Sequence, residues 1–182
     1  MPAVERDPIY PGCQSVKRLV HVGGRNGHEL LEDLKGSGVE INELGLALLS
    51  SPAFKASETR RPLVTIELTV RNLGFPQGAT ISAVYEMAKN LGLSLCPVEL
   101  GPHLRLQYLD QPEGFWGQPE SRHRAPPGSI TIASGVLEED DDFPKGFYLR
   151  RIKGALWLRG YRSDSGLIWS PEDRLIFCED RK

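Results

Sequence analysis

The sequence has few cysteines and no long apolar segment. Its three cysteines, Cys13, Cys96 and Cys178, lie far apart without CxxC spacing, which favours free thiols in a reducing compartment over a disulfide framework. No run approaches the roughly 18 apolar residues of a membrane span. The N-terminal segment MPAVERDPIYPGC carries charges and prolines where a secretory signal has an apolar core. We therefore predict a cytoplasmic protein with no membrane partner.

The sequence also lacks an excess of positive charge. Lys and Arg total 22 against 24 Asp and Glu, and the formal net charge of −2 creates no overall field that attracts nucleic acid. Any nucleic-acid contact would have to be local. Hydrophobic residues make up 40% of the 182 residues, which is enough to build the core of one domain at this length.

Familiar catalytic and metal-binding spacings are absent as well. The four histidines form no HxxxH or HExxH pattern, and no GxSxG elbow is present. The run HVGGRNG lacks the Lys-Ser/Thr of a phosphate-binding loop and the spacing of GxGxxG, so a plain turn is favoured over an anion cradle. We predict no metal and no cofactor.

Hydrophobic spacing predicts helices and one strand in the first half of the chain. Helical periodicity predicts a helix in HELLEDLKGSG, a second in EINELGLALLSSPAF with Asn42 as its N-cap, and a third that begins near Ile81 and ends at Gly92. The strict alternation in TIELTVR predicts a strand with one buried and one solvated side.

The second half is predicted to be rich in strands. Residues 103–109 alternate between apolar and polar side chains as a strand does, whereas residues 111–128 have the prolines, glycines and charges of a long surface loop. ITIASGVL, FYLRRIKGALWLRGY and RLIFC follow as strands, with Lys153-Gly154 at a hairpin turn. The run EEDDD between them is typical of a solvated acidic loop.

These elements predict an α+β fold in which a helical N-terminal part packs on a mostly antiparallel sheet with a C-terminal β-meander. Alternating β and α units are too few for a doubly wound parallel sheet. Residues 1–20, rich in proline and charge, are predicted to form a flexible arm, and residues 21–182 a single domain.

One polar row stands out in the stretch LCPVELGPHLRLQYLDQPEGFW. If residues 103–109 form a strand, His103, Arg105 and Gln107 share one face, and a neighbouring strand would place Glu67 and Arg71 beside them. Such a polar floor would bind a small anion, a peptide or a nucleotide.

A second candidate surface is the predicted hairpin near the C-terminus. From residue 145 to residue 162 the chain carries six cations and no acid, with aromatic residues interleaved, which is the composition of a surface that contacts phosphates and stacks bases. Arg151 and Arg159 are its candidate binding residues. The acidic run just before it would oppose a polyanion, so nucleic acid is not the favoured partner.

The block from about Leu68 to Gly114 resembles an uncharacterised family of bacterial proteins that share LGLxLCPxExGPxLRLQYxDQP wording and are called hypothetical or, occasionally, helicase. The resemblance implies a bacterial origin and transfers no activity. Family members commonly have glutamine where this chain has His103. A helicase motor needs a phosphate-binding loop and two nucleotide-clamping lobes, and this chain has neither the loop motif nor the length.

Three functions follow from these features. The leading prediction is a non-enzymatic binding module that receives another protein or a small anionic ligand around Arg105, Gln107 and the 111–128 loop. The first alternative is a small hydrolase or nuclease acting on RNA, with His103 as general acid or base and Arg105 steadying a phosphate. The second is a nucleic-acid accessory factor that uses the 150–162 hairpin. The sequence leaves the oligomeric state open.

Overall fold

The computed structural model describes residues 7–114 and 128–180. Eight strands form one large sheet in the order β1-β3-β10-β6-β7-β8-β2, with β5 paired to β10 outside this path, and β4 and β9 form a small second sheet. The strands are β1 Val16–Val22, β2 Glu40–Ile41, β3 Arg61–Thr69, β4 Ala79–Thr80, β5 Leu93–Ser94, β6 Ile130–Ile132, β7 Gly146–Ile152, β8 Ala155–Tyr161, β9 Ile168–Trp169 and β10 Arg174–Glu179. The helices are α1 Gly27–Gly36, α2 Glu43–Ser50, α3 Ile81–Asn90 and α4 Leu100–Gln107, with a 3-10 turn η1 at Arg71–Leu73.

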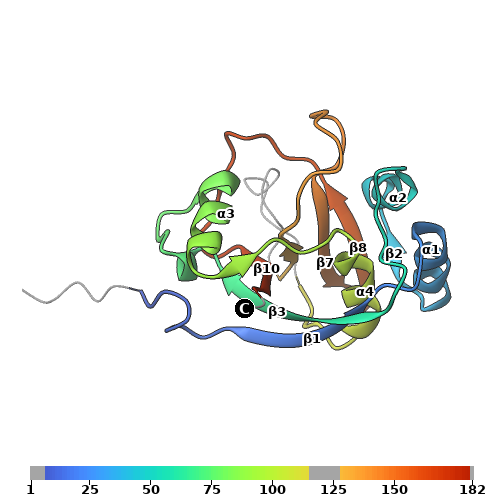
Figure 1. Cartoon of the computed structure of the whole chain (residues 1–182), viewed down its shortest axis with the longest axis horizontal. Coiled ribbons are helices and arrows are strands. Elements are labelled where there is room, and N and C mark those ends of the chain that lie inside the picture. The colour runs from blue at the N-terminus through green and yellow to red at the C-terminus, as the bar shows by residue number, and fades with distance from the viewer. Residues whose placement is uncertain (1–6, 115–127, 181–182) are drawn as a thin grey trace, which may run out of the picture.

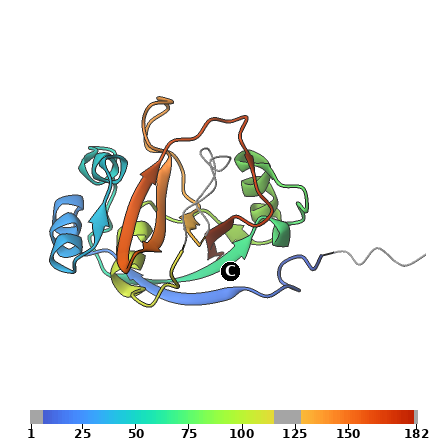
Figure 2. The same ribbon diagram turned by 180° about the vertical axis from the view of Figure 1, so that it is seen from behind.

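The predicted fold class is confirmed. Neighbouring strands of the large sheet are antiparallel except for the β10–β6 and β2–β8 pairs, which are parallel. Strands β6, β7 and β8 form the expected C-terminal meander. Figure 1 shows α1 and α2 at one end of the molecule and α3 at the other, with the curved sheet between them, and Figure 2 shows the same arrangement from behind.

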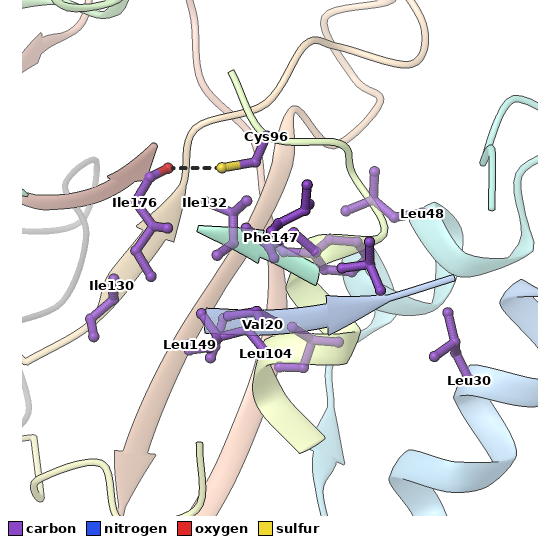
Figure 3. Packing of buried hydrophobic residues seen from close by; sticks show 14 of the residues in the cluster. Val20, Leu30, Leu48, Cys96, Leu104, Ile130, Ile132, Phe147, Leu149 and Ile176 are labelled. Carbon is purple, nitrogen blue, oxygen red and sulfur yellow. Dashed lines mark hydrogen bonds between the residues drawn. The ribbon is translucent and has the colours of Figure 1, made fainter. Parts of the chain in front are cut away.

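Hydrophobic clusters pack against both faces of the sheet, although much of β1, including Leu19, stays exposed. Helices α1, α2 and α4 pack on one face, where Leu30, Leu104 and Phe147 belong to the first hydrophobic cluster (Figure 3). Helix α3 packs on the other face, where Val84 contributes to the second cluster together with Leu68 from the sheet. Burial of each such side chain contributes about 1.5–3 kcal/mol to folding.

Local sequence signals account for the first three helices. Asn26 caps α1 in a capping box, since its side chain accepts from the Glu29 N–H and the Glu29 carboxylate accepts from the Asn26 N–H. Asn42 caps α2 as predicted and also exchanges hydrogen bonds with the backbone of Gly160 in β8. The cap of α2 therefore also attaches this helix to the sheet.

The predicted hairpin is confirmed. Lys153 and Gly154 both have positive φ values, of 49° and 77°, as a two-residue turn of the primed type requires. Seven pairs then align β7 with β8, from Gly146 opposite Tyr161 to Ile152 opposite Ala155.

The strand predicted for residues 103–109 is wrong, because residues 100–107 form helix α4. The apolar spacing of Leu104 and Tyr108 fits a helix as well as a strand, so this short alternation does not distinguish the two. Pro102 lies in the first helical turn, where its missing N–H costs nothing. Gly101 allows the helix to dock, because a Cβ there would lie 2.7 Å from Cδ2 of Phe147.

The prediction of a flexible arm at residues 1–20 is wrong for residues 16–20. Residues 16–20 belong to β1, which pairs antiparallel with β3 from Val16 opposite Glu67 to Val22 opposite Arg61. The long loop predicted for residues 111–128 falls largely on residues 115–127, outside the described residues. In the described part of the chain no helix is long and apolar enough to cross a membrane.

Candidate functional site

Arg105 lies inside the protein rather than on a polar surface. Its side chain has no exposed area, and its guanidinium donates through Nη1 to Oε1 of Gln111 at 2.6 Å and through Nη2 to the carbonyl of Tyr108. Nη1 also reaches the carbonyls of Arg150 and Trp157 at 3.4 and 3.3 Å. Burial lowers the pKa of Arg105 to about 10. Arg105 therefore connects α4 to β7 and β8 through hydrogen bonds, and it has no exposed surface at which a ligand could bind.

The other residues of the predicted polar floor also have partners within the chain. Gln107 is exposed, but its amide accepts from the N–H of His21 at 3.0 Å and donates to the carbonyl of the same residue at 2.7 Å. Glu67, predicted on a solvated side, is buried between Arg18 and Arg174. These residues stabilise the scaffold.

Two further predicted binding residues form ion pairs at the surface. Arg71 contacts the carboxylates of Asp7 and Glu172 at 2.9 and 2.5 Å. Arg151 contacts Glu113 at 3.4 Å. Neither guanidinium is thus left without a counter-charge.

His103 belongs to a buried polar network. Its Nε2 accepts a hydrogen bond from the N–H of Gly23 at 3.1 Å and lies 3.9 Å from the carboxylate of Glu99. Glu99, which is itself buried, accepts from the hydroxyl and the N–H of Ser57 at 2.5 and 3.0 Å. The sequence signalled His103 and, four positions before it, Glu99, but it carried no sign that Ser57 would reach Glu99 from 42 positions away.

This network explains the glycine-rich run HVGGRNG. Gly23 and Gly24 have φ values of 91° and 77°, and a Cβ on Gly23 would lie 2.2 Å from the carbonyl oxygen of Thr59. The N–H of Gly23 donates to His103 and that of Gly24 to the carbonyl of Ser57 at 2.8 Å. These two amides are used within the protein, as the prediction of a plain turn requires.

The His103 network predicts a loss of stability in acid. Burial lowers the pKa of His103 and outweighs the opposing effect of Glu99, while Arg60 and Arg25 lower the pKa further and Asp33 raises it. The folded state therefore binds fewer protons than the unfolded state, so this residue stabilises the fold above its unfolded pKa of about 6.5 and loses that contribution as the pH falls below it. We expect the free energy of unfolding, measured with urea, to fall between about pH 7 and pH 5.

The matched variant for this prediction is His103→Gln, which keeps a hydrogen-bond acceptor but does not titrate. Its free energy of unfolding should fall less over the same pH range, because the group whose pKa is lowered in the folded state has been removed. Equal pH dependence in the two proteins would contradict a titrating role for His103.

The β7–β8 hairpin carries the strongest candidate binding surface. In the strand register Tyr148 lies opposite Arg159 and Arg150 opposite Trp157, which places these four side chains on one face of the sheet. Nε of Arg159 donates to the hydroxyl of Tyr148 at 2.8 Å, and its guanidinium lies 4.9 Å from the centre of the Trp157 ring. Burial lowers the pKa of the neighbouring Arg150, and the positive charge of Arg159 contributes to the shift.

Arg159 differs from the other predicted binding arginines in its environment. It is half-buried, and among residues 7–114 and 128–180 no carboxylate lies within ion-pair distance of it. Its two Nη atoms have no hydrogen-bond partner in the same part of the chain. A stacked, oriented guanidinium with unused donors is suited to bind a carboxylate or a phosphate.

Within the described residues, no group of three or more His, Cys, Asp or Glu side chains is placed to hold a metal ion. The acidic run Glu138–Asp142 is exposed along its whole length.

Comparison with known proteins adds no identification. No protein-family model matches the chain, and neither a curated protein nor a solved structure matches it. The resemblance to the uncharacterised bacterial family therefore stays a prediction.

Proposed function

We propose that this chain is a non-enzymatic binding module that holds an anionic group of its ligand at Arg159, on the face of the β7–β8 hairpin. One observation carries the proposal: Arg159 is stacked on Trp157 and bonded to Tyr148, yet it has no carboxylate partner among the described residues. A half-buried guanidinium whose Nη donors have no partner among the described residues is available to bind an anion.

The arrangement suits a discrete anion. The bond to Tyr148 and the stacking on Trp157 hold the planar guanidinium in one orientation, so little side-chain entropy is lost when two parallel N–H groups bind an oxyanion. Burial and, to a lesser extent, the positive charge of Arg159 lower the pKa of Arg150, so the two cations lie close enough to contribute to one local field.

The surroundings favour a small anionic group over a long polyanion. Lys145 lies 3.9 Å from Asp141, and Arg162 donates to the carbonyl of Asp142 at 2.7 Å. The exposed acidic loop beside them would repel a nucleic-acid backbone. Two cations of the predicted basic run are thus directed toward acidic-loop residues.

The positions of Arg105 and His103 do not favour the hydrolase alternative. Arg105, which was to steady a phosphate, has no exposed area, and Nε2 of His103 is engaged with the Gly23 N–H. The burial of these groups supports a structural role for both.

The test compares Arg159→Ala with Arg162→Ala, since Arg162 is an exposed arginine close in sequence whose hydrogen bond among the described residues goes to the carbonyl of Asp142. Binding of phosphate, a dicarboxylate and a nucleoside monophosphate is measured by calorimetry at about 50 mM salt, where screening is weak. We expect at least one probe to bind, and Arg159→Ala to weaken it about tenfold, equivalent to about 1.4 kcal/mol. Arg162→Ala should bind as the wild type does.

Arg159→Lys separates the contribution of the planar pair of N–H donors from the contribution of the positive charge. Lysine keeps the positive charge but loses the planar donor pair, so affinity should fall between those of the wild type and Arg159→Ala. The proposal fails if none of the probes binds, or if both alanine variants bind equally well.

A further inference from the structure

Strand β1 is the outermost strand of the large sheet. Among the described strands it pairs with β3 alone, and Figure 1 and Figure 2 both show it along one side of the molecule. The outer edge of such a strand presents a row of backbone N–H and C=O groups with which another strand can pair.

One side chain already bonds to this edge as a partner strand would. The carboxamide of Gln107 accepts from the N–H of His21 at 3.0 Å and donates to the carbonyl of His21 at 2.7 Å. Two residues that face each other in an antiparallel ladder exchange the same two bonds. Gln107 therefore takes the place of a partner residue at His21, and both backbone groups of His21 point away from β3.

The strand register extends this geometry to Lys17 and Leu19. β1 and β3 pair residue for residue along the whole of β1, without a bulge. Because backbone groups alternate between the two edges of a strand, Lys17 and Leu19 direct their N–H and C=O outward as His21 does. Among residues 7–114 and 128–180, no backbone hydrogen bond joins these outward groups to a neighbouring element.

We propose that β1 binds an extended acidic segment of a partner protein, which adds an antiparallel strand beside residues 16–20 and ends at Gln107. The outward groups of Lys17 and Leu19 supply the backbone hydrogen bonds. Leu19 also supplies an apolar contact, because its side chain is 60% exposed and lies opposite the half-buried Val64. This surface is separate from the anion site proposed at Arg159.

The charges around β1 favour a carboxylate on the incoming strand. Arg18 and Arg174 share the single carboxylate of Glu67, at 2.6 and 2.5 Å, so this group of three retains one positive charge. Lys17 is balanced by Glu179. An acidic residue directly opposite Arg18 is therefore stabilising, whereas a basic residue there is destabilising.

The same charges disfavour a second copy of this chain as the occupant. The symmetric register that pairs residues 16–20 of two copies places Arg18 opposite Arg18. Like charges directly opposite each other destabilise an antiparallel pair.

The probe is the blocked peptide Thr-Thr-Val-Glu-Val-Thr-Thr, whose glutamate would lie opposite Arg18 and whose valines would lie opposite Lys17 and Leu19. Binding to the full chain is measured by calorimetry at about 50 mM salt. We expect this peptide to bind, and the same peptide with lysine in place of glutamate to bind at least about tenfold more weakly.

Two variants at one position test the backbone contact. Leu19→Pro removes an outward N–H and leaves the bonds between β1 and β3 in place, as edge strands allow, so the glutamate peptide should bind about tenfold more weakly. Leu19→Val, the matched control, retains the N–H and an apolar side chain, and should bind the peptide as the wild type does.

Hydrogen exchange of the unmutated chain gives a measurement that needs no variant. In the free protein the amides of Lys17 and Leu19 should exchange rapidly, and those of Arg18 and Val20, which the register directs to β3, slowly. The glutamate peptide should slow exchange at Lys17 and Leu19.

Four results would overturn the proposal. The first two are a glutamate peptide that does not bind and equal binding by Leu19→Pro and Leu19→Val. The third is protection of β8 around Arg159 in place of β1, which would assign the peptide to the anion site. The fourth is a molar mass of twice 20.2 kDa with Lys17 and Leu19 protected in the absence of peptide, which would make a second copy the occupant.

Discussion

Replacement of Arg105 by alanine is expected to lower the free energy of unfolding by about 3–5 kcal/mol, the cost of deleting one member of a buried charged network. The guanidinium is the hydrogen-bond donor for Gln111 and for the carbonyls of Tyr108, Arg150 and Trp157. Its removal takes the close donor away from Oε1 of Gln111 and from the carbonyl of Tyr108 and opens a cavity inside the fold. Urea denaturation of the two proteins measures the difference directly.

The control for Arg105→Ala is the exposed Arg162→Ala, which should change the free energy of unfolding by no more than about 0.5 kcal/mol. The comparison decides between scaffold and ligand-binding roles for Arg105. If Arg105→Ala proved as stable as the wild type, the hydrogen bonds of the guanidinium could not be what holds α4 against the β7–β8 hairpin.

Replacement of Glu67 by glutamine is expected to cost about 2–3 kcal/mol of folding free energy. The buried carboxylate accepts from Arg18 at 2.6 Å and from Arg174 at 2.5 Å, and Arg18 also lies 4.4 Å from the centre of the Tyr108 ring. Glutamine has the same shape but places an amide N–H₂ against one of the two donors. The loss stays below that of a fully buried pair, because the side chain of Arg174 is 41% exposed.

The matched control is Glu179→Gln, because Glu179 pairs with Lys17 at 3.4 Å while both side chains are largely in solvent, 40% and 61% exposed. Such a surface pair contributes about 0–1 kcal/mol. Equal urea midpoints for the two glutamine variants would show that Glu67 is not a structural carboxylate and would restore it as a candidate ligand-binding residue.

Both predictions concern residues that the sequence marked as binding residues. Arg105 and Glu67 are polar residues in alternating segments, and alternation normally places polar side chains in solvent. Their burial depends on partners far away in the chain, since Arg105 reaches carbonyls 45 and 52 positions later and Glu67 reaches Arg174 across 107 positions. Periodicity does not contain that information.

The candidate binding surface could be predicted from the sequence only in part. The interleaved cations and aromatic residues of the hairpin were visible, and Arg159 was named among them. The strand register brings Tyr148 opposite Arg159 and Trp157 beside it, whereas Arg151 points to the other face and meets Glu113. Arg151 and Arg159 lie in the same stretch of cations and aromatic residues, and only their neighbours in the folded protein distinguish them.

Short-range patterns were sufficient for α1, α2, α3 and the β7–β8 turn, because caps, helical spacing and a positive-φ pair act between residues a few positions apart. Long-range packing settled the rest. It made residues 100–107 a helix, turned Arg105 and Glu67 into buried residues bonded within the chain, and left Arg159 with no carboxylate partner among the described residues. These outcomes depend on which groups meet after the chain folds, and the balance between desolvation and pairing at each contact decides whether a polar side chain supports the fold or stays available to a ligand.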